Sequence, residues 1–357
     1  MTGTDGTGAG RRVCGILPPY ILEKLAEADE TAVREAAQET LAVDAEFREA
    51  RAITPSRVGP EALPERFVLK RTVFDTHHSL FLPGDVVRRE GEPPGTDGTA
   101  TRAYESLGLT FDFYREAYGR HSIDDGNLGL DATVHYRRRF NNAFWDGERM
   151  VFGDGDGRVF NDFTISVDVV AHELTHGVTE YTAGFEYQDQ SGALNESMSD
   201  VFGSLVKQFA RRQTAEEADW LIGAGLFTPA VRGQALRSMR APGTAYDSPL
   251  LGGRDPQPDH MTHYVHGPED NGGVHINSGI PNHAFYLTAV AIGGFAWERA
   301  GRIWYDTLTS GRLSRTADFQ EFARATVATA ERLYGTRTEF EAVVKAWSDV
   351  GLNGHGP

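Results

Sequence analysis

The sequence predicts an α+β fold with two lobes, the first rich in strands and the second mainly helical, behind a short N-terminal segment. Strand-forming Val, Phe and Thr gather in residues 66–78 and in residues 132–157, where Gly and Asp mark turns. From about Ser166 to the C-terminus the apolar spacing is mostly helical. We find no internal repeat or heptad run, so the expected order is a pro-segment, a strand-rich lobe and a helical lobe.

The N-terminal part of the chain changes character several times. Residues 1–12 are rich in Gly and Thr, which is typical of a flexible end, and residues 20–50 are rich in Ala, Leu and Glu, which predicts a helix. Residues 53–65 carry three prolines and a glycine, which indicates a linker or a processing region. A loop at 91–99 then leads into a helical pattern at 100–119.

The composition limits the classes of partner. Apolar residues make up 40% of the 357 residues, enough for a sizeable core in one long domain or two. The formal net charge of −16 repels phosphate backbones and anionic lipid, so we expect no nucleic-acid or membrane binding. Cys14 is the only cysteine, which excludes an intramolecular disulfide. No signal peptide is recognisable, so we expect a cytoplasmic protein or export by a non-standard route, secretion included.

The segment "TISVDVVAHELTHGVTEYTAG" predicts one amphipathic helix, with Ser166 as N-cap and Gly184 as its end. His172 and His176 are four residues apart, so their imidazoles lie one above the other and can bind one metal ion. Glu173 points about 100° away around the helix, close to the ion, where a base for a metal-bound water belongs. The apolar stripe of this helix consists of Val167, Ala171, Leu174 and Val178.

A catalytic zinc takes three protein ligands and keeps a fourth position open. Glu196 in "GALNESMSD" is the candidate third ligand, because nineteen residues separate it from His176, enough for a helix end, a turn and a new helix. Ligating histidines donate their other N–H to a carboxylate or carbonyl, and Asp200 and Asn195 are the candidates for that contact. A chance histidine pair on a helix surface is the alternative, and the downstream acidic stretch argues against it.

These motifs resemble the thermolysin family of zinc metalloendopeptidases, in the family's order over roughly residues 67–352. The agreeing stretches are "VVAHELTHGVTEYTAGFEYQDQSGALNESMSD" and residues 141–157, 235–239 and 270–280. The resemblance implies a two-lobed fold with the zinc helix at the floor of the cleft between the lobes. It places the N-terminal catalytic lobe, with this helix, at 61–186 and the helical C-terminal lobe at 187–357.

The resemblance also implies a role for each matching residue. The zinc ligands would be His172, His176 and Glu196, with Glu173 as the general base. The positions that match those binding the peptide backbone of the substrate are Asn142, Ala143 and Arg237. The positions that align with the wall of the apolar pocket after the scissile bond are Phe160, Phe163, Val169 and Leu236.

An oxyanion site is expected as well, because peptide hydrolysis builds negative charge on the carbonyl oxygen. By resemblance, His275 and Tyr187 match the oxyanion donors, and Asp270 matches the partner that keeps this histidine protonated. In "DNGGVH" the two glycines let the chain fold back, so that Asp270 touches His275 and raises its pKa. The alternatives are a solvated histidine in a Gly-rich turn, a core tyrosine at 187 and a surface salt bridge at Arg237.

Structural calcium near the zinc helix is common in the family, but the double calcium site is expected to be absent here. Asp168 and Asp219 match calcium-binding positions, whereas Lys207, Leu221 and Ala224 stand where further carboxylates would be expected. A cation inside a calcium cage prevents calcium binding. We therefore expect one catalytic Zn²⁺ as the cofactor.

Two further motifs receive a plain interpretation. "GDGDG" at 153–157 lacks the Lys-Ser/Thr of a phosphate loop and the span of an EF-hand, so it predicts a hairpin turn. A second metal site is the alternative for "HMTHYVH", which contains His260, His263 and His266, but a mixed loop near the cleft is the better interpretation.

Residues 1–60 resemble the short propeptide of protealysin-like members of the family, which carry a Pro-Pro motif early in the precursor, as in "CGILPPYILEKLAE". We expect this segment to inhibit or chaperone the catalytic part and to be removed by cleavage near 53–66. Cys14 is a candidate thiolate cap on the zinc, because zinc accepts sulfur. A small apolar residue beside the Pro-Pro motif is the alternative.

The expected function is that of a neutral zinc endopeptidase, monomeric, that cleaves proteins and peptides before bulky apolar residues. A zinc aminopeptidase also uses HExxH and a distant Glu, but the Gly-x-Met-Glu-Asn stretch that such enzymes need for the free amine is absent from the sequence. A non-catalytic binding protein on the same scaffold is the other alternative. The complete set of catalytic residue types argues against it.

Overall fold

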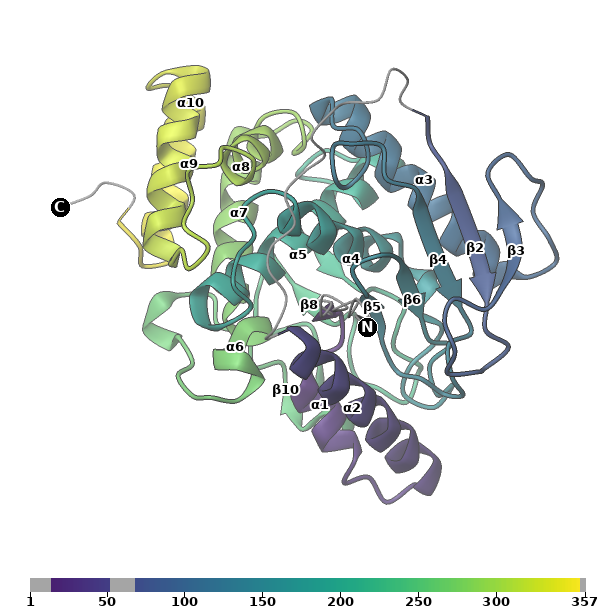
Figure 1. Cartoon of the computed structure of the whole chain (residues 1–357). Helices are drawn as coiled ribbons and strands as arrows, with labels where there is room; N and C mark the ends of the chain where they lie inside the picture. Colours follow the sequence, from purple (N-terminus) through teal and green to yellow (C-terminus); the bar gives the residue numbers. More distant parts are fainter. Residues whose placement is uncertain (1–13, 52–67, 354–357) are drawn as a thin grey trace, which may run out of the picture.

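Residues 14–51 and 68–353 are described by the structure, a computed structural model of the chain (Figure 1). They form the predicted α+β fold, with a strand-containing N-terminal lobe and a helical C-terminal lobe. The segment 1–12 and the predicted cleavage region at 53–66 lie outside the described residues. No helix of the described part combines the length and the apolar character that crossing a membrane requires.

A six-stranded sheet forms the framework of the N-terminal lobe, with the strand order β1-β5-β6-β4-β2-β3. Strand β4 pairs in parallel with β2 and β6, whereas the remaining pairs are antiparallel. The N-terminal segment supplies an edge strand, because β1 pairs with β5. The strands are β1 (Cys14–Gly15), β2 (Arg71–Asp75), β3 (Asp85–Arg89), β4 (Leu130–Val134), β5 (Ala143–Trp145) and β6 (Met150–Phe152).

Helix α3 (Gly98–Tyr118) packs against β2 and β4 on one side and against the central helix α4 on the other. The Asp97 side chain begins this helix by accepting a hydrogen bond of 2.8 Å from the Thr99 N–H. Gly119 ends it in the left-handed conformation, with φ at 72°. This helix corresponds to the pattern predicted at 100–119.

Helices α4 (Val167–Glu180) and α5 (Asp189–Arg211) pack against each other at the centre of the molecule (Figure 1). Apart from Val167, all of α4 is buried, as expected for a helix in a core between two lobes. Gly203 of α5 allows the two backbones to approach, because a Cβ there would lie 2.6 Å from the carbonyl oxygen of Asp168. Side chains of the two helices therefore meet at short range.

The C-terminal lobe consists of helices joined by loops and very short strands. Trp304 and Trp347 stack in its core with ring centroids 6.1 Å apart. The helices are α6 (Asp270–Asn277), α7 (Gly279–Ile292), α8 (Ala300–Leu308), α9 (Phe319–Tyr334) and α10 (Thr338–Asp349). The short strands are β7 (Leu221–Ile222), β8 (Arg237–Ser238), β9 (Asp247–Ser248) and β10 (Gly253–Arg254), which the mostly helical prediction for this part of the chain did not include.

The N-terminal segment contains two helices, α1 (Pro19–Leu25) and α2 (Thr31–Arg51), instead of the single helix predicted at 20–50. Helix α1 ends at Leu25, and Ala26 is its C-cap. The Ala26 N–H donates to the carbonyl oxygen of Leu22 at 2.8 Å, the Glu27 N–H donates to that of Lys24 at 3.2 Å, and the chain then turns. The Arg34 guanidinium stabilises this turn by donating to the carbonyl oxygen of Ala28 at 2.7 Å. Ala-rich sequence alone did not mark the break, because neither Gly nor Pro lies in it.

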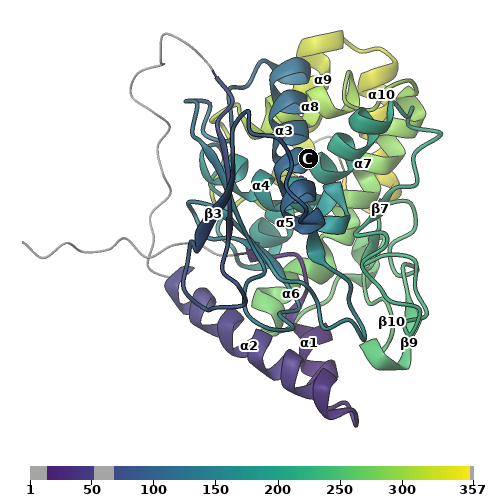
Figure 2. The same cartoon turned by 90° about the vertical axis from the view of Figure 1, so that its right-hand side faces the viewer.

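These two helices lie against the outside of the rest of the molecule, with α1 near α6 and β10 (Figures 1 and 2). Their charges face arginines of that part: Glu30 lies 3.2 Å from Arg158, and Glu39 lies 3.4 Å from Arg137. The Thr40 hydroxyl accepts a hydrogen bond of 3.1 Å from a backbone N–H of that part. The segment is therefore packed on the molecule by apolar, polar and charged contacts.

The hairpin prediction for 132–157 holds for one pair of strands only. β5 and β6 form an antiparallel hairpin, and its turn is held by Asp146, which accepts hydrogen bonds of 2.8 Å from the N–H groups of Glu148 and Arg149. The hairpin turn predicted at 153–157 is wrong. The chain after β6 bridges to Phe227 through Phe160, and the Asp156 carboxylate accepts from three following N–H groups to form a loop.

The predicted end of the metal-binding helix at Gly184 also needs correction. Helix α4 ends at Glu180, because Tyr181 leaves the helical conformation with ψ near 0°. Gly184 closes the following turn, where its N–H donates to the Thr179 carbonyl oxygen at 2.7 Å. Ser166 is the N-cap residue, but its hydroxyl bonds Asp168 instead of a backbone N–H.

Candidate active site

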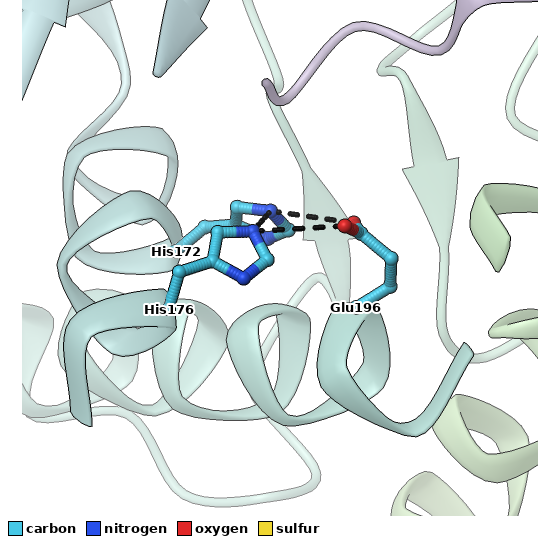
Figure 3. A group of neighbouring side chains, drawn as sticks. All are labelled: His172, His176 and Glu196. Atoms are coloured by element: carbon cyan, nitrogen blue, oxygen red, sulfur yellow. Dashed lines mark hydrogen bonds and ion pairs between the residues drawn. The ribbon is translucent and has the colours of Figure 1, made fainter. Parts of the chain in front are cut away.

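Three predicted ligand side chains converge where α4 and α5 face each other (Figure 3). The Nε2 atoms of His172 and His176 are 3.1 Å apart. The carboxylate oxygens of Glu196 lie 3.5 Å and 3.6 Å from these two nitrogens. All three side chains are buried, so one small volume holds two imidazole nitrogens and one carboxylate.

The other nitrogen of each imidazole has a partner on α5. His172 Nδ1 lies 2.8 Å from Asp200 Oδ1, and His176 Nδ1 lies 2.8 Å from Asn195 Oδ1. Because both partner oxygens only accept hydrogen bonds, each Nδ1 carries the proton and each neutral ring keeps a lone pair on Nε2. The structure therefore places Asp200 and Asn195 on the histidines in the way that the sequence suggested.

This arrangement fits a bound cation. Two lone pairs and a carboxylate that face one another in a buried space repel each other unless a positive charge lies among them. Glu196 Oε2 is buried and has no hydrogen-bond partner in the described structure. A catalytic zinc takes two nitrogens and one oxygen of this kind as three of its four tetrahedral ligands and keeps the fourth position open.

Glu173 lies next to this site and points toward the edge of the sheet. Its Oε2 accepts a hydrogen bond of 3.2 Å from the N–H of Trp145 in β5. The side chain is fully buried. The carboxylate is thus held between the metal ligands and β5.

His275 reaches the site from α6, where the chain folds back as predicted. Asn271, Gly272 and Gly273 have positive φ angles of 53°, 84° and 75°. A Cβ on Gly272 would lie 2.1 Å from a carboxylate oxygen of Asp189, so glycine is required there. The result is that Asp270 Oδ1 lies 2.6 Å from His275 Nδ1.

The free side of this imidazole faces Tyr187 and the metal ligands. His275 Nε2 lies 3.2 Å from the Tyr187 hydroxyl and 3.6 Å from Glu196. Burial lowers the pKa of His275, but the charges of Asp270 and Glu196 outweigh burial and raise the pKa to about 9. Burial raises the pKa of Glu196, whereas the positive charge of His275 lowers it, to about 2.

Arg237 of β8 is buried behind the site and bonds the same Asp200 that holds His172. Its Nε and Nη2 donate to the two oxygens of Asp200 at 2.8 Å each, and Asn282 donates to Oδ2 at 2.8 Å. Burial raises the pKa of Asp200, but Arg237 and His172 hold it well below its usual range. The surface salt bridge considered for Arg237 is therefore wrong.

The N-terminal segment occupies the space beside these groups. Arg237 Nη1 donates to the carbonyl oxygen of Ile16 at 3.0 Å. The N–H of Ile16 donates to the carbonyl oxygen of Ala143 at 3.1 Å, and the N–H of Leu17 donates to Asn142 Oδ1 at 3.0 Å. Each of the three residues predicted to bind a substrate backbone thus binds residues 16 and 17, which sequence reasoning did not anticipate.

The four predicted pocket-wall residues are all buried in the same apolar cluster as Ile16. The rings of Phe160 and Phe163 lie 5.8 Å apart, and Leu236 directly precedes Arg237. Their role in substrate selection stays a prediction. These residues are Phe160, Phe163, Val169 and Leu236.

Lys207 lies between the two carboxylates that match calcium-binding positions. Its Nζ is 2.7 Å from Asp168 and 2.8 Å from Asp219, and it also donates to the carbonyl oxygen of Leu221. The ammonium group therefore lies between the two carboxylates and forms an ion pair with each.

Fold and site together define a two-lobed metallopeptidase with an HExxH helix. The comparisons with known proteins agree. Residues 70–180 match the family model of the thermolysin metallopeptidase catalytic domain, and residues 183–352 match that of the thermolysin metallopeptidase alpha-helical domain. An extracellular metalloprotease of Pectobacterium carotovorum subsp. carotovorum is 50% identical over 342 residues, which are 96% of this chain and 97% of that protein.

Two further relatives extend along almost the whole chain. Protease PrtS of Photorhabdus sp. (strain Az29) is 44% identical over 346 residues, covering 95% of this chain and 92% of its own. The solved structure of the protealysin precursor, a metalloproteinase from Serratia proteamaculans, superimposes with a TM-score of 0.86 and 50% identity, covering 95% of this chain and 99% of that one.

The chain belongs to the thermolysin family and is a zinc metalloprotease. The predicted resemblance to its protealysin-like members is confirmed.

Proposed function

We propose that the site hydrolyses internal peptide bonds with the division of roles that the sequence predicted. His172, His176 and Glu196 hold one Zn²⁺, which when bound acts as a Lewis acid and lowers the pKa of water to about 7. Glu173 takes the proton from the attacking water and passes it to the leaving amine. His275, oriented by Asp270, donates to the carbonyl oxygen as negative charge develops there, with Tyr187 beside it.

The substrate backbone is positioned by Asn142, Ala143 and Arg237. The observation that supports these roles best is that all three bind the extended backbone at Ile16 and Leu17. Ile16 is apolar and fully buried, which supports a preference for bulky apolar residues after the scissile bond. The predicted division of the chain into 1–60, 61–186 and 187–357 belongs to this proposal.

The test of this function is caseinolysis with and without a chelator, together with metal analysis of the pure protein. We expect one zinc per chain and activity that the chelator removes and zinc restores. A blocked peptide cleaved internally separates an endopeptidase from an aminopeptidase. Zinc-free protein with full caseinolytic activity would refute the proposal.

The N-terminal segment acts in this proposal as an inhibitory propeptide. Its residues 15 and 16 bind His275 and Arg237 through their carbonyl oxygens, and His172 and Glu173 are fully inaccessible to solvent while His275 is 4% exposed. A solved relative is described as a precursor and matches this chain along nearly all of its length, which supports the interpretation. Deletion of residues 1–60 should lower the folding yield or remove latency, and unchanged yield and latency would contradict it.

Cys14 lies in β1 with its Cα opposite Trp145, and its side chain is outside the described part of the structure. The zinc cap therefore stays a prediction. Replacement of Cys14 by Ser should weaken latency if the thiolate binds the ion, whereas unchanged latency would favour the small apolar residue.

Two properties complete the proposal. The position of Lys207 between Asp168 and Asp219 supports the absence of the double calcium site. The relative from Pectobacterium is named an extracellular protein, and we propose that this chain is likewise exported and acts as a monomer on proteins and peptides.

A further inference from the structure

The N-terminal segment runs through the site in one defined direction. Residues 14 and 15 pair antiparallel to β5, with Cys14 opposite Trp145 and Gly15 opposite Phe144. The next two residues continue this pairing through Ala143 and Asn142. Because Asn142, Ala143 and Arg237 are the groups proposed to bind a substrate, the segment has the polarity and register of a substrate.

That register places one particular peptide bond at the reacting position. His275 Nε2 lies 3.2 Å from the carbonyl oxygen of Gly15, where the proposed oxyanion donor meets a scissile carbonyl. On the other side of the same bond, Ile16 is held through its N–H by Ala143 and through its carbonyl by Arg237. The buried sec-butyl side chain of Ile16 then stands directly after the bond, as the proposed specificity requires.

Glycine at position 15 is needed for this close approach. A Cβ there would lie 2.6 Å from Asn142 Nδ2 and 3.1 Å from Asn142 Oδ1. The Asn142 amide cannot move away without loss of two hydrogen bonds, because Oδ1 accepts from the N–H groups of Leu17 and Ala143 at 3.0 Å each. A side chain at this position would therefore shift the bond out of register.

We propose that the precursor cuts its own chain between Gly15 and Ile16, a step that rests on the proposed function of the site. The oxygen of one water molecule bonds to the carbonyl carbon of Gly15, and the bond from that carbon to the Ile16 nitrogen breaks. Glu173 carries a proton from the water to this nitrogen. The products are a carboxylate at Gly15 and an amine at Ile16.

The cut removes residues 1–15 and leaves the remainder of the segment bound. Leu17 keeps its hydrogen bond to Asn142, Glu39 of α2 keeps its ion pair with Arg137, and Glu30 before α2 keeps its ion pair with Arg158. Pro18 and Pro19 have no N–H, so pairing with β5 stops at Leu17 and the chain enters α1. Self-cleavage at this bond is therefore a trimming step that precedes removal of the propeptide.

The test follows the intact mass and N-terminal sequence of the full chain after purification, with zinc added. We expect the wild-type chain to acquire Ile16 as its N-terminus at a rate that does not change over a hundredfold dilution, because the bond lies in its own site. The Glu173→Gln chain should stay uncut, also when active wild-type protein is added, because its bond is covered by its own fold.

Two matched variants test the register. Gly15→Val should slow the cut at least tenfold, and Ile16→Pro should abolish it, because proline removes the N–H that bonds Ala143. As a readout without turnover, the Ile16 and Leu17 amides of metal-free Glu173→Gln protein should be protected from hydrogen exchange. Exchange of these amides at the rate of an unfolded chain would overturn the proposal.

The outcomes separate this step from the function on which it rests. Wild-type protein that digests casein but retains an intact bond between Gly15 and Ile16 would overturn the self-cleavage and leave the protease function in place. Wild-type protein that contains zinc but cuts neither casein nor itself would refute the function, and the self-cleavage with it.

Discussion

Asp200 and Arg237 form a bidentate ion pair that connects the candidate metal site to the residues proposed to bind a substrate backbone. Both carboxylate oxygens accept from the guanidinium at 2.8 Å, and one of them also meets His172 Nδ1 at 2.8 Å. The remaining nitrogen of Arg237 holds the carbonyl oxygen of Ile16. One carboxylate therefore orients a proposed zinc ligand and a proposed substrate clamp together.

Replacement of Asp200 by Asn should consequently disturb both functions. The neutral amide cannot accept two charged hydrogen bonds as strongly, so zinc affinity should fall about 10- to 100-fold. KM for peptides should rise as well, since Arg237 loses its orientation. Zinc titration with a competing chelator and peptide kinetics measure the two effects, with the exposed Glu298→Gln as control. A rise in KM with unchanged zinc affinity would contradict the shared role.

Replacement of Glu173 by Gln should abolish turnover and leave the metal in place. The amide cannot take a proton from water, and general-base catalysis contributes about 10²- to 10⁴-fold. Gln retains an oxygen that can accept the hydrogen bond from the Trp145 N–H, so the fold should persist. Caseinolysis and metal analysis on the same sample provide the test, and a variant with normal activity would exclude Glu173 as the base.

Replacement of Lys207 by Met should destabilise the protein without affecting the ligands directly. The change would leave the fully buried Asp168 without its cation, which costs about 3–5 kcal/mol in the free energy of unfolding, whereas the partly exposed Asp219 keeps Arg211 at 3.6 Å. Calcium should leave the Tm of the unmodified chain unchanged. A calcium-dependent rise in the Tm of the chain with Lys207 intact would show that a calcium site is present after all.

Replacement of Gly15 by Val should weaken latency. The added side chain collides with the Asn142 amide, so the segment binds the site less tightly and the still uncut precursor cleaves a small fluorogenic peptide at a higher initial rate. Asp29→Asn, an exposed change in the turn between α1 and α2, provides a control with intact contacts at the site. Equal initial rates for the two uncut variants would argue against inhibition by residues 14–17.

Local spacing was sufficient to predict that His172 and His176 share one helix face and that Glu196 and Asp200 share another, because the helical period fixes these faces. The fold-back at "DNGGVH" was predictable for a similar reason, since two glycines permit it. The pairing of Gly15 with β5 was not predictable, because contacts between residues far apart in sequence depend on the assembled fold. The two-residue strands β7 to β10 carry no period at all, and the break between α1 and α2 contains no residue that marks a turn.

His135 gives a prediction for the dependence of stability on pH. Its two ring nitrogens bridge Asp154 at 2.8 Å and Asp97, the N-cap of α3, at 3.0 Å, and the ring of His78 lies 5.6 Å away. The hydrogen bond with Asp154 is the largest influence and raises the pKa of His135. Burial lowers this pKa, the hydrogen bond with Asp97 raises it further, and the result is a pKa of about 9.

Because the pKa of His135 in the folded chain lies above that of an unfolded histidine, about 6.5, the bridge stabilises the protein fully below that pH. Its contribution declines as the pH rises through about 9, where the folded imidazole loses its proton. Thermal unfolding of the inactive Glu173→Gln chain between pH 6 and pH 10 measures this decline without autolysis. Addition of His135→Gln to this chain should lower the Tm at pH 6 and make the fall of the Tm between pH 7 and pH 10 shallower. Parallel curves of Tm against pH for the two proteins would exclude the His135 bridge as the cause of the fall.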